Sequence, residues 1–494
     1  MDAPRERANP HLPTEILEMI LLAPLGEHGE HGEHGEHWHF AMSLVCRRWR
    51  DVLAAWRGRG ALRGIVRKLR TPTVIGVLSV PLAAWARASG CPWDTDTCAE
   101  AARRGHLAVL QYLRRHDLPG GPCPWDEWTC SYAAGGGHLK TLQWARRHDL
   151  PGGPCPWDDW VCTKAAEGGH LAVLQWARAH YCPWDGWACH SAAKGGHLEL
   201  LQWARSNGCP WNEGTCSSAA EGGHLAVLQW ARETGCPWDD WTCAGAAGGG
   251  HLEVLKWAHA NGSPWDVSTC TAAAEGGHLA VLQWLRGHPG GPCPWSSGAC
   301  SAAAQYGQLE ILKWLRANGC PWDEFTCSEA AAEGRLEILQ WARKNGCPWD
   351  EATCELAIES GHLDVLQWAH NNGCPWNTDT CSFASIAARR GDLEILQWLR
   401  ANGCPWSEDT CRAAAIGGNL ELLQYLRRPD RSGGPCPWDA GTCSGAVQGG
   451  HLALLQWARE KGCPWSEDQI HVMRRCSRPE VTQWALANGC RIAE

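Results

Sequence analysis

Cysteine and histidine are the residues of this 494-residue chain with the most chemical potential, and both recur at fixed spacing. Most of the 29 cysteines form pairs separated by six residues, such as Cys236 and Cys243. So many thiols suggest a secreted disulfide scaffold or a metal-binding array. However, C-x6-C is not a zinc spacing, and no C-x2-C pair occurs. We interpret the thiols as structural, small and readily buried, with disulfides and metal ligation as the alternatives.

Histidine recurs in a G-H-L motif, as at His106, His138, His170 and His197. A catalytic histidine is expected once, in an asymmetric setting, whereas these residues share one local context. We interpret them as turn or capping residues. No phosphate-binding glycine loop, nucleophile elbow or paired-carboxylate motif is present. The sequence therefore predicts that the chain is not an enzyme and needs no cofactor or metal.

These residues belong to a repeating unit, of which Cys236 to Gly262 is one 27-residue copy. We number the unit from its first residue, so that Cys236 is position 1 and Cys243 is position 8. Self-similarity at a fixed period predicts a repeat architecture. Fourteen copies begin at Cys91, Cys123, Cys155, Cys182, Cys209, Cys236, Ser263, Cys293, Cys320, Cys347, Cys374, Cys404, Cys436 and Cys463.

Two short helices are predicted in each unit. Position 4 is Asp, Asn or Ser, the residues that cap a helix N-terminus, and helix A then runs to about position 13. Its apolar positions 8, 11 and 12 have helical spacing, and glycines near 14 and 15 end it. Helix B starts near position 16 and ends at an Asn-Gly C-cap signal. Such a hairpin cannot form a core alone, so the units must stack.

The residues T-C-x-x-A-A-x-x-G-H-L-x-V-L resemble the ankyrin repeat. The matching residues in one unit are Thr242, Ala246, Ala247, Gly250, His251, Leu255 and Ala258. Because this unit has 27 residues and the ankyrin unit has about 33, the resemblance implies that the family's β-hairpin is reduced to a tight C-P-W turn. The array looks like the shortened ankyrin-like arrays of giant DNA viruses of amoebae.

The N-terminal region carries two amphipathic helical patterns, in residues 12–22 and 41–53. They resemble the two ends of an F-box, which docks onto the small adaptor of cullin–RING ubiquitin ligases. The resemblance implies that the docking residues are Leu12, Pro13, Ile16, Leu17, Ile20, Leu44, Val45 and Trp49. Between the two patterns, residues 26–37 repeat Gly-Glu-His without any apolar residue, which predicts a solvated loop. The alternative is that the two helices only cap the repeat array.

The predicted fold is therefore all-α: an F-box-like helical module followed by an ankyrin-like α-solenoid of about 14 helix-turn-helix repeats. We expect a flexible N-terminus at 1–10, the F-box-like module at 11–55, a linker at 56–73 and the solenoid at 74–490. The last repeat, 463–490, loses the pattern and is expected to cap the array. One unit carries three additional residues after Cys381, nearly one helical turn, so its apolar face can survive.

The net charge and the hydropathy of the chain limit the kinds of partner that we expect it to bind. The formal net charge of −9 argues against a nucleic-acid-binding surface, which needs a basic stripe. No apolar run is long enough for a transmembrane helix, and the N-terminus lacks the apolar core of a signal peptide. We expect a monomer with neither nucleic-acid nor membrane partners, in the cytoplasm (of the host if the chain is viral) or in the nucleus.

Positions that vary between units are where target recognition is expected. Position 6, on the first turn of helix A, holds a large aromatic in five units: Trp128, Trp160, Trp187, Trp241 and Phe325. Trp is a frequent hot-spot residue of protein interfaces, so we predict that these side chains bind a target protein. The alternative is that each ring folds onto the turn of the neighbouring repeat. The predicted function is an adaptor that tethers a target to a ubiquitin ligase, with a non-ligase scaffold as the alternative.

Overall fold

The computed structural model describes residues 79–88, 93–118, 120–150, 152–375, 381–404, 406–428, 434–464 and 478–488. Within these ranges the chain forms 28 helices and no strand, so the predicted all-α repeat fold is confirmed. The F-box-like module, its eight predicted docking residues, the Gly-Glu-His segment and the 56–73 linker lie outside the described residues.

Each complete unit of the described chain contributes an A helix and a B helix, as the spacing predicts. The A helices are α6 (Thr95–Arg103), α8 (Glu127–Gly135), α10 (Trp160–Glu167), α12 (Gly186–Lys194), α14 (Glu213–Glu221), α16 (Asp240–Gly248), α18 (Val267–Glu275), α20 (Ser297–Gln305), α22 (Glu324–Ala332), α24 (Glu351–Ser360), α26 (Cys381–Arg390), α28 (Glu408–Ile416) and α30 (Ala440–Gly449). Among the helices of the described ranges, none is long and apolar enough to cross a membrane.

The B helices begin one residue after the place of the G-H-L histidine, which holds Gln308, Arg335, Asp392 or Asn419 in four units. They are α7 (Leu107–Leu113), α9 (Leu139–Ala145), α11 (Leu171–Ala179), α13 (Leu198–Ser206), α15 (Leu225–Glu233), α17 (Leu252–Ala260), α19 (Leu279–Arg286), α21 (Leu309–Ala317), α23 (Leu336–Lys344), α25 (Leu363–Asn371), α27 (Leu393–Ala401), α29 (Leu420–Leu426) and α31 (Leu452–Glu460). Two further helices, α5 (Val80–Ala88) and α33 (Pro479–Ala487), have the B-helix pattern without a described A helix.

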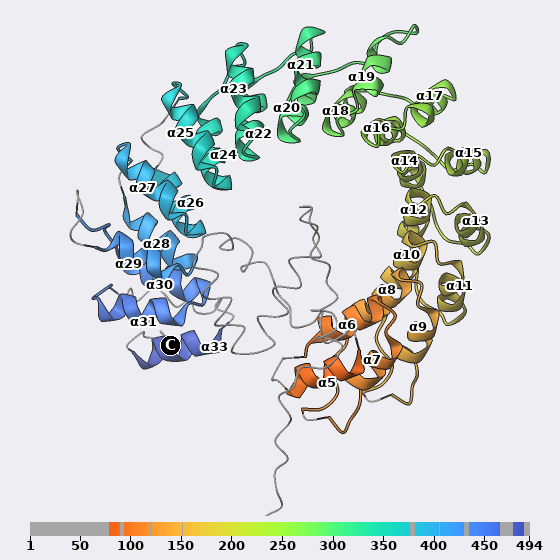
Figure 1. The fold of residues 1–494 in the computed structure, drawn as a ribbon, viewed down its shortest axis with the longest axis horizontal. Coiled ribbons are helices and arrows are strands. Elements are labelled where there is room, and N and C mark those ends of the chain that lie inside the picture. Colours follow the sequence, from red (N-terminus) through yellow and green to blue (C-terminus); the bar gives the residue numbers. More distant parts are fainter. Residues whose placement is uncertain are drawn as a thin grey trace, which may run out of the picture. The chain divides into compact units, whose positions relative to one another are not determined.

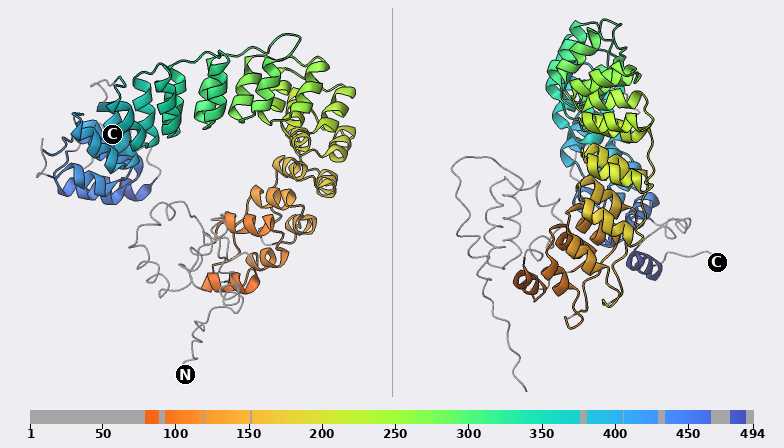
Figure 2. Two further views of the ribbon diagram at one scale, coloured as in Figure 1. Left: turned by 45° about the horizontal axis from the view of Figure 1, so that its top comes forward. Right: turned by 90° about the vertical axis from the view of Figure 1, so that its right-hand side faces the viewer.

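The chain divides into two compact units. The first contains α5 to α15 with most of α16 and α17, and the second contains α18 to α33. Within each unit the A helices pack side by side in one row, and each B helix packs against the A helix of its own repeat (Figure 1). The further views in Figure 2 show the same two-layered arrangement of A and B helices. The row of A helices therefore presents equivalent positions of successive repeats next to one another.

Small and branched apolar side chains form the core of every repeat. In one repeat Cys243, Ala246 and Ala247 of α16 and Leu255 of α17 are fully buried. The 24 cysteines whose side chains the structure describes are all buried and unbridged. Alanine at positions 11 and 12 allows neighbouring A helices to approach closely, because its side chain is a single methyl group. The predicted apolar stripe of helix A is thus confirmed as the core face.

Capping explains where the A helices begin. Asp94 accepts a hydrogen bond from the Thr97 backbone N–H at 3.1 Å, and the Thr97 hydroxyl accepts one from the Asp94 N–H at 3.3 Å. This reciprocal capping box satisfies two donors that the helix leaves free. In α10 the helix begins one residue later, and Asp158 accepts from the Trp160 N–H at 3.2 Å. Asp159 precedes the regular helix but already has helical backbone angles, so Asp158 before it supplies the capping side chain.

The three additional residues of one unit do not lengthen its described A helix. α26 has ten residues, as α24 and α30 do, so the expected additional turn within helix A is not present in it. Its buried side chains are Phe383, Ala384, Ala387 and Ala388, which recur at helical spacing. Counted back from Gly391, the three alanines hold the places of positions 8, 11 and 12, so the apolar face is kept.

Candidate partner-binding surface

The candidate surface is the edge of the A-helix row formed by the first turns, and three sets of contacts between repeats hold that edge in place. One set centres on the tryptophan of position 3. The Trp238 ring lies under the Arg232 guanidinium of the preceding repeat, 4.0 Å from its centroid. Trp257 of the same repeat meets Trp238 edge-on at 6.0 Å between centroids. Arg232 also donates a hydrogen bond to the Cys236 carbonyl oxygen at 2.6 Å.

This arginine–tryptophan bracket recurs along both units, with the guanidinium 3.8–4.7 Å from the ring centroid. This bracket was not predicted, although an arginine recurs at position 24 in most units and was the available signal. The pairs are Arg87–Trp93, Arg114–Trp125, Arg146–Trp157, Arg178–Trp184, Arg205–Trp211, Arg232–Trp238, Arg286–Trp295, Arg316–Trp322, Arg343–Trp349, Arg400–Trp406 and Arg427–Trp438.

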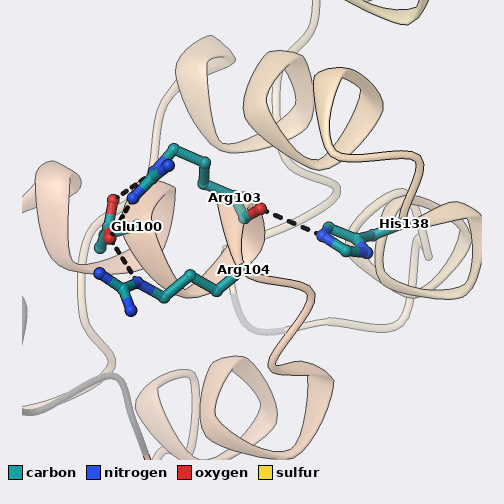
Figure 3. Close-up of polar contacts among 4 residues, drawn as sticks. All are labelled: Glu100, Arg103, Arg104 and His138. Atoms are coloured by element: carbon teal, nitrogen blue, oxygen red, sulfur yellow. Dashed lines mark hydrogen bonds and ion pairs between the residues drawn. The ribbon is translucent and has the colours of Figure 1, made fainter. Parts of the chain in front are cut away.

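The histidine of position 16 forms a second contact between repeats. Nε2 of His138 hydrogen-bonds to the carbonyl oxygen of Arg103, at the end of the preceding A helix, at 3.1 Å (Figure 3). Last-turn carbonyls have no partner within their own helix, so the imidazole satisfies one of them. Equivalent contacts are made by His170, His197, His278 and His451. These histidines join consecutive repeats, which agrees with the predicted capping role.

Thiols form the third contact. The Cys123 Sγ donates to the Asp94 carbonyl oxygen at 3.2 Å, and in the one unit with serine at position 1 the Ser263 hydroxyl donates to Asp239 in the same way at 3.1 Å. The neighbouring Cys123 thiol, together with burial, raises the pKa of Cys98 well above its ordinary value. A thiol with a raised pKa stays protonated at neutral pH and is a poor nucleophile and metal ligand. For Cys98 this chemistry fits the interpretation of a structural thiol.

These contacts between repeats fix the A helices, and the position-6 aromatics project from the first turns of those helices. The exposed fraction is 39% for Trp128, 46% for Trp160, and 63% for both Trp187 and Trp241. Phe325 of α22, in the second compact unit, is 59% exposed. Each ring is open to solvent over much of its surface, which a side chain folded onto the neighbouring turn would not be. Their role in binding a target stays a prediction.

Two of these rings form a cluster on the first compact unit. The ring centroids of Trp128 and Trp160 lie 6.1 Å apart, and Tyr132, one turn further along α8, lies 5.8 Å from Trp128. Tyr132 is 36% exposed and was missed by the sequence analysis, although its i+4 spacing from Trp128 places both on one helix face. Trp187 contacts His190 of its own helix at 5.2 Å.

Carboxylates surround these aromatics. We define the first-turn strip as positions 4–6 of the first six complete units, residues 94–96, 126–128, 158–160, 185–187, 212–214 and 239–241. Ten of its 18 residues are Asp or Glu, four are Trp, and none is Lys or Arg. No residue of the strip is buried. The strip is therefore an aromatic and strongly acidic surface.

Two carboxylates of the first-turn strip have raised pKa values, in keeping with the excess of acidic over basic side chains there. Partial burial, and after it the neighbouring Asp159 and Glu127, raise the pKa of Asp158 even though the Trp160 N–H opposes the shift. Partial burial and the Asp240 carboxylate likewise raise the pKa of Asp239. Like charges in adjacent first turns thus repel one another, and a cation bound there would relieve that repulsion.

A second surface feature, in the other compact unit, has the opposite character. An open cavity of about 690 Å³ lies between residues of α24, α26 and α28. Arg389, Arg390 and Arg412 line it, together with Glu359 and Asp409. Arg390 is committed to the carbonyl oxygen of Ser360 at 3.0 Å and to the Asp392 carboxylate at 2.7 Å. We describe the cavity as part of the fold and assign it no ligand.

Residues 354–400 match the family model of ankyrin repeats (many copies). The match runs from α24 to α27 and so includes two helix pairs. This ankyrin match bears out the ankyrin part of the sequence resemblance over these residues. No curated protein matches the chain.

Solved structures similar to this chain include the pentatricopeptide repeat protein PPR10 from maize, at 13% identity and a TM-score of 0.29. Two further structures show PPR10 in complex with an 18-nt psaJ RNA element, one of them a triple cysteine-to-serine variant, each at 14% identity and a TM-score of 0.30. All three similarities cover 92% of this chain and 78% of the PPR10 chain.

The comparison corrects one prediction. We expected no nucleic-acid partner because the net charge is −9, but two of these structures hold an RNA. That prediction is wrong, because net charge averages over the whole chain and does not exclude a local nucleic-acid site.

Proposed function

We propose that this chain is a non-enzymatic binding scaffold whose A-helix row holds a partner protein. The repeat solenoid is a protein-binding architecture, because stacked hairpins present equivalent positions of many repeats on one extended face. The single observation that carries the proposal is the set of exposed position-6 aromatics on that face. Exposed clusters of large aromatic side chains on a folded domain usually mark a partner site.

We further propose that the N-terminal module docks the scaffold onto the adaptor of a cullin–RING ubiquitin ligase. Support comes from the F-box-like residues Leu12 to Ile20 and Leu44 to Trp49 in the sequence. The scaffold would then raise the concentration of its bound partner at the ligase, which supplies the chemistry of transfer. Such a tether would act in the cytoplasm or nucleus, where that machinery operates.

A pull-down with two variants separates the two halves of this proposal. Ile16→Asp with Leu17→Asp places charges on the predicted docking helix, so the adaptor should be lost while the partner protein is retained. Trp160→Ala with Trp187→Ala removes exposed rings only, so the partner should be lost while the adaptor is retained. Each variant therefore serves as the matched control of the other.

Specific outcomes would reject each part. If the unaltered chain recovers no adaptor, or the Ile16→Asp, Leu17→Asp variant recovers as much as the unaltered chain, docking is rejected and a non-ligase scaffold is the remaining function. If the tryptophan variant recovers its partner undiminished, the position-6 aromatics do not form the binding surface. Circular dichroism of both variants verifies that helix content is unchanged.

A further inference from the structure

The first-turn strip aligns aromatic rings from consecutive A helices. Trp128, Trp160 and Trp187 occupy the same repeat position in α8, α10 and α12, which pack side by side in one row. Trp241 occupies that position in α16, and Gly214 interrupts the series in α14. Adjacent packed helices lie about 8–10 Å apart, so the three tryptophan positions recur along the strip at about that interval. The rings of Trp128 and Trp160 approach more closely, to 6.1 Å between centroids.

The negative charge of the first-turn strip determines which ligand groups can stack on its tryptophan rings. Its carboxylates include Glu127, Asp159 and Asp240, and none of its residues is a cation. Cations elsewhere on these A helices are paired with acids: Lys164 with Glu167 at 2.6 Å and Lys194 with Glu221 at 2.7 Å. The Lys164 ammonium also lies over the Trp160 ring, at 6.0 Å from its centroid. The strip thus combines aromatic faces, which attract cations, with carboxylates that have few cations near them.

The protein already uses this recognition internally. In nine of the arginine–tryptophan brackets a guanidinium stacks on an indole and donates at the same time to a backbone carbonyl oxygen, as Arg286 does with Trp295 and Cys293. A guanidinium suits this arrangement because it is planar, weakly hydrated and rich in donors. An exposed indole beside a carboxylate offers an incoming arginine the same two kinds of contact, with a stronger acceptor.

We propose that the first-turn strip binds an extended, arginine-rich segment of a partner protein, whose guanidinium groups stack on the exposed tryptophans. The inference rests on the proposed function, that the A-helix row holds a protein. In the polyproline II form of an extended chain each residue advances about 3.1 Å and every third side chain points to the same side, so three residues span about one repeat. Arginines at every third residue would meet Trp128, Trp160 and Trp187, and six residues would separate the last of these from the arginine on Trp241.

The test is fluorescence anisotropy with labelled peptides and the full chain, since 34 tryptophans preclude an intrinsic signal. The probe is a Gly-Ser peptide with arginines at its residues 1, 4, 7 and 13. A second peptide of the same composition carries its four arginines in one contiguous block, and a third has glutamate in place of arginine. We expect the spaced peptide to bind at least several-fold more tightly than the block peptide, and the glutamate peptide not to bind.

Variants assign the binding to the strip. Trp160→Ala with Trp187→Ala should weaken the spaced peptide about tenfold or more, because two cation–π contacts are removed. Asp158→Asn with Asp159→Asn keeps the shape of the side chains and should also weaken it, with a reduced dependence on salt. Tyr181→Ala is the matched control, since Tyr181 is a 92% exposed aromatic outside the strip, and it should leave the affinity unchanged.

Three results would overturn the inference. One is equal binding of the spaced peptide by the tryptophan variant and the unaltered chain. Another is equal affinity for the spaced and block peptides, which would mean attraction by charge alone without registration on the repeats. The third is tight binding of an 18-nt single-stranded RNA that is lost in the tryptophan variant, which would assign the strip to nucleic acid. Should the pull-down partner depend on the tryptophans while the spaced peptide does not bind, the proposed function stands and only this inference fails.

Discussion

At the scale of the residue, the arginine of position 24 joins its own repeat to the next one. It stacks on the tryptophan of the next repeat and donates to the carbonyl oxygen beside it, as Arg232 does with Trp238 and Cys236. A cation–π contact contributes about 0.5–2 kcal/mol, and a hydrogen bond to a charged donor about 1.5–3 kcal/mol. The two gains are made by one side chain and are partly offset by the entropy of fixing it.

Replacing Arg232 by Ala should therefore destabilise its repeat by about 1–3 kcal/mol. Lysine should recover part of this loss, because it retains the charge but not the planar fork of donors. Native-state hydrogen exchange of α15 and α16 measures the effect. Arg389→Ala, at an exposed position 13, is the control and should change little. Unchanged protection in Arg232→Ala would show that the bracket contributes nothing to repeat stability.

Glu100 provides a pH-dependent prediction. Burial favours its neutral form, but hydrogen bonds from Arg103 at 2.7 Å and Arg104 at 2.6 Å outweigh burial and lower its pKa (Figure 3). Since the folded-state pKa lies below the unfolded value, the ionised carboxylate stabilises the fold above that unfolded value. The contribution is lost as the pH falls through the folded-state pKa.

The Glu100→Gln variant should thus be less stable than the unaltered chain at pH 6, with the difference shrinking on acidification to about pH 3. This difference in stability is measured by hydrogen exchange or limited proteolysis, followed at the residues of α6 and α7. Glu199→Gln, at an exposed site on α13, is the control and should track the unaltered chain at both pH values. A difference at Glu100 that stays constant between pH 6 and pH 3 would contradict the linkage.

At the scale of the element, the turn between helix A and helix B is the tightest constraint. Gly250 has a φ of +75°, and a Cβ placed there would lie 2.5 Å from the His278 ring of the following repeat. Gly262 at the end of helix B has a φ of +90°, yet a Cβ there would meet nothing within 4 Å. The two glycines share a left-handed backbone, but only Gly250 also makes room for a neighbour.

Alanine at these two glycines separates backbone strain from the close approach. Gly262→Ala should cost about 1–2 kcal/mol, the penalty for an L-residue in the left-handed region. Gly250→Ala should cost more, because the His278 ring must also move and its bond to the Gly248 carbonyl oxygen, 3.0 Å long, is disturbed. Thermal unfolding followed by circular dichroism compares them, and equal losses would exclude a role for the histidine contact.

At the scale of the whole molecule, stability in a stacked array comes from each repeat and its immediate neighbours. Leu201 of α13 and Leu366 of α25 are both fully buried and belong to different compact units. Replacing either by Ala should cost about 2–5 kcal/mol. We expect hydrogen-exchange protection to fall in the altered repeat and the repeats next to it, while repeats of the other unit keep theirs. Uniform loss of protection along the chain would show one cooperative core instead.

The sequence by itself determined the repeat period, the helix bounds, the caps and the buried face of each hairpin. These depend on residues within one unit: aspartate at position 4, alanines at positions 11 and 12, and glycine before His251. Helix formation and capping are local, so one copy of the pattern specifies them and thirteen further copies repeat the evidence. The exposed position-6 aromatics followed from the same reasoning, because they lie off the apolar stripe.

Only the tertiary structure decided which side chains meet across repeats. Arg232 and Trp238 are close in sequence, but Trp128 and Trp160 are separated by 31 residues and come together through the packing of α8 on α10. The proximity of acidic first turns from neighbouring repeats, and the cavity beside α26, likewise arise from the stacking. A repeat pattern determines the helices and side chains of each hairpin. The distance between two hairpins depends instead on how their buried faces pack together. That fit places carboxylates and indoles from separate repeats on one surface.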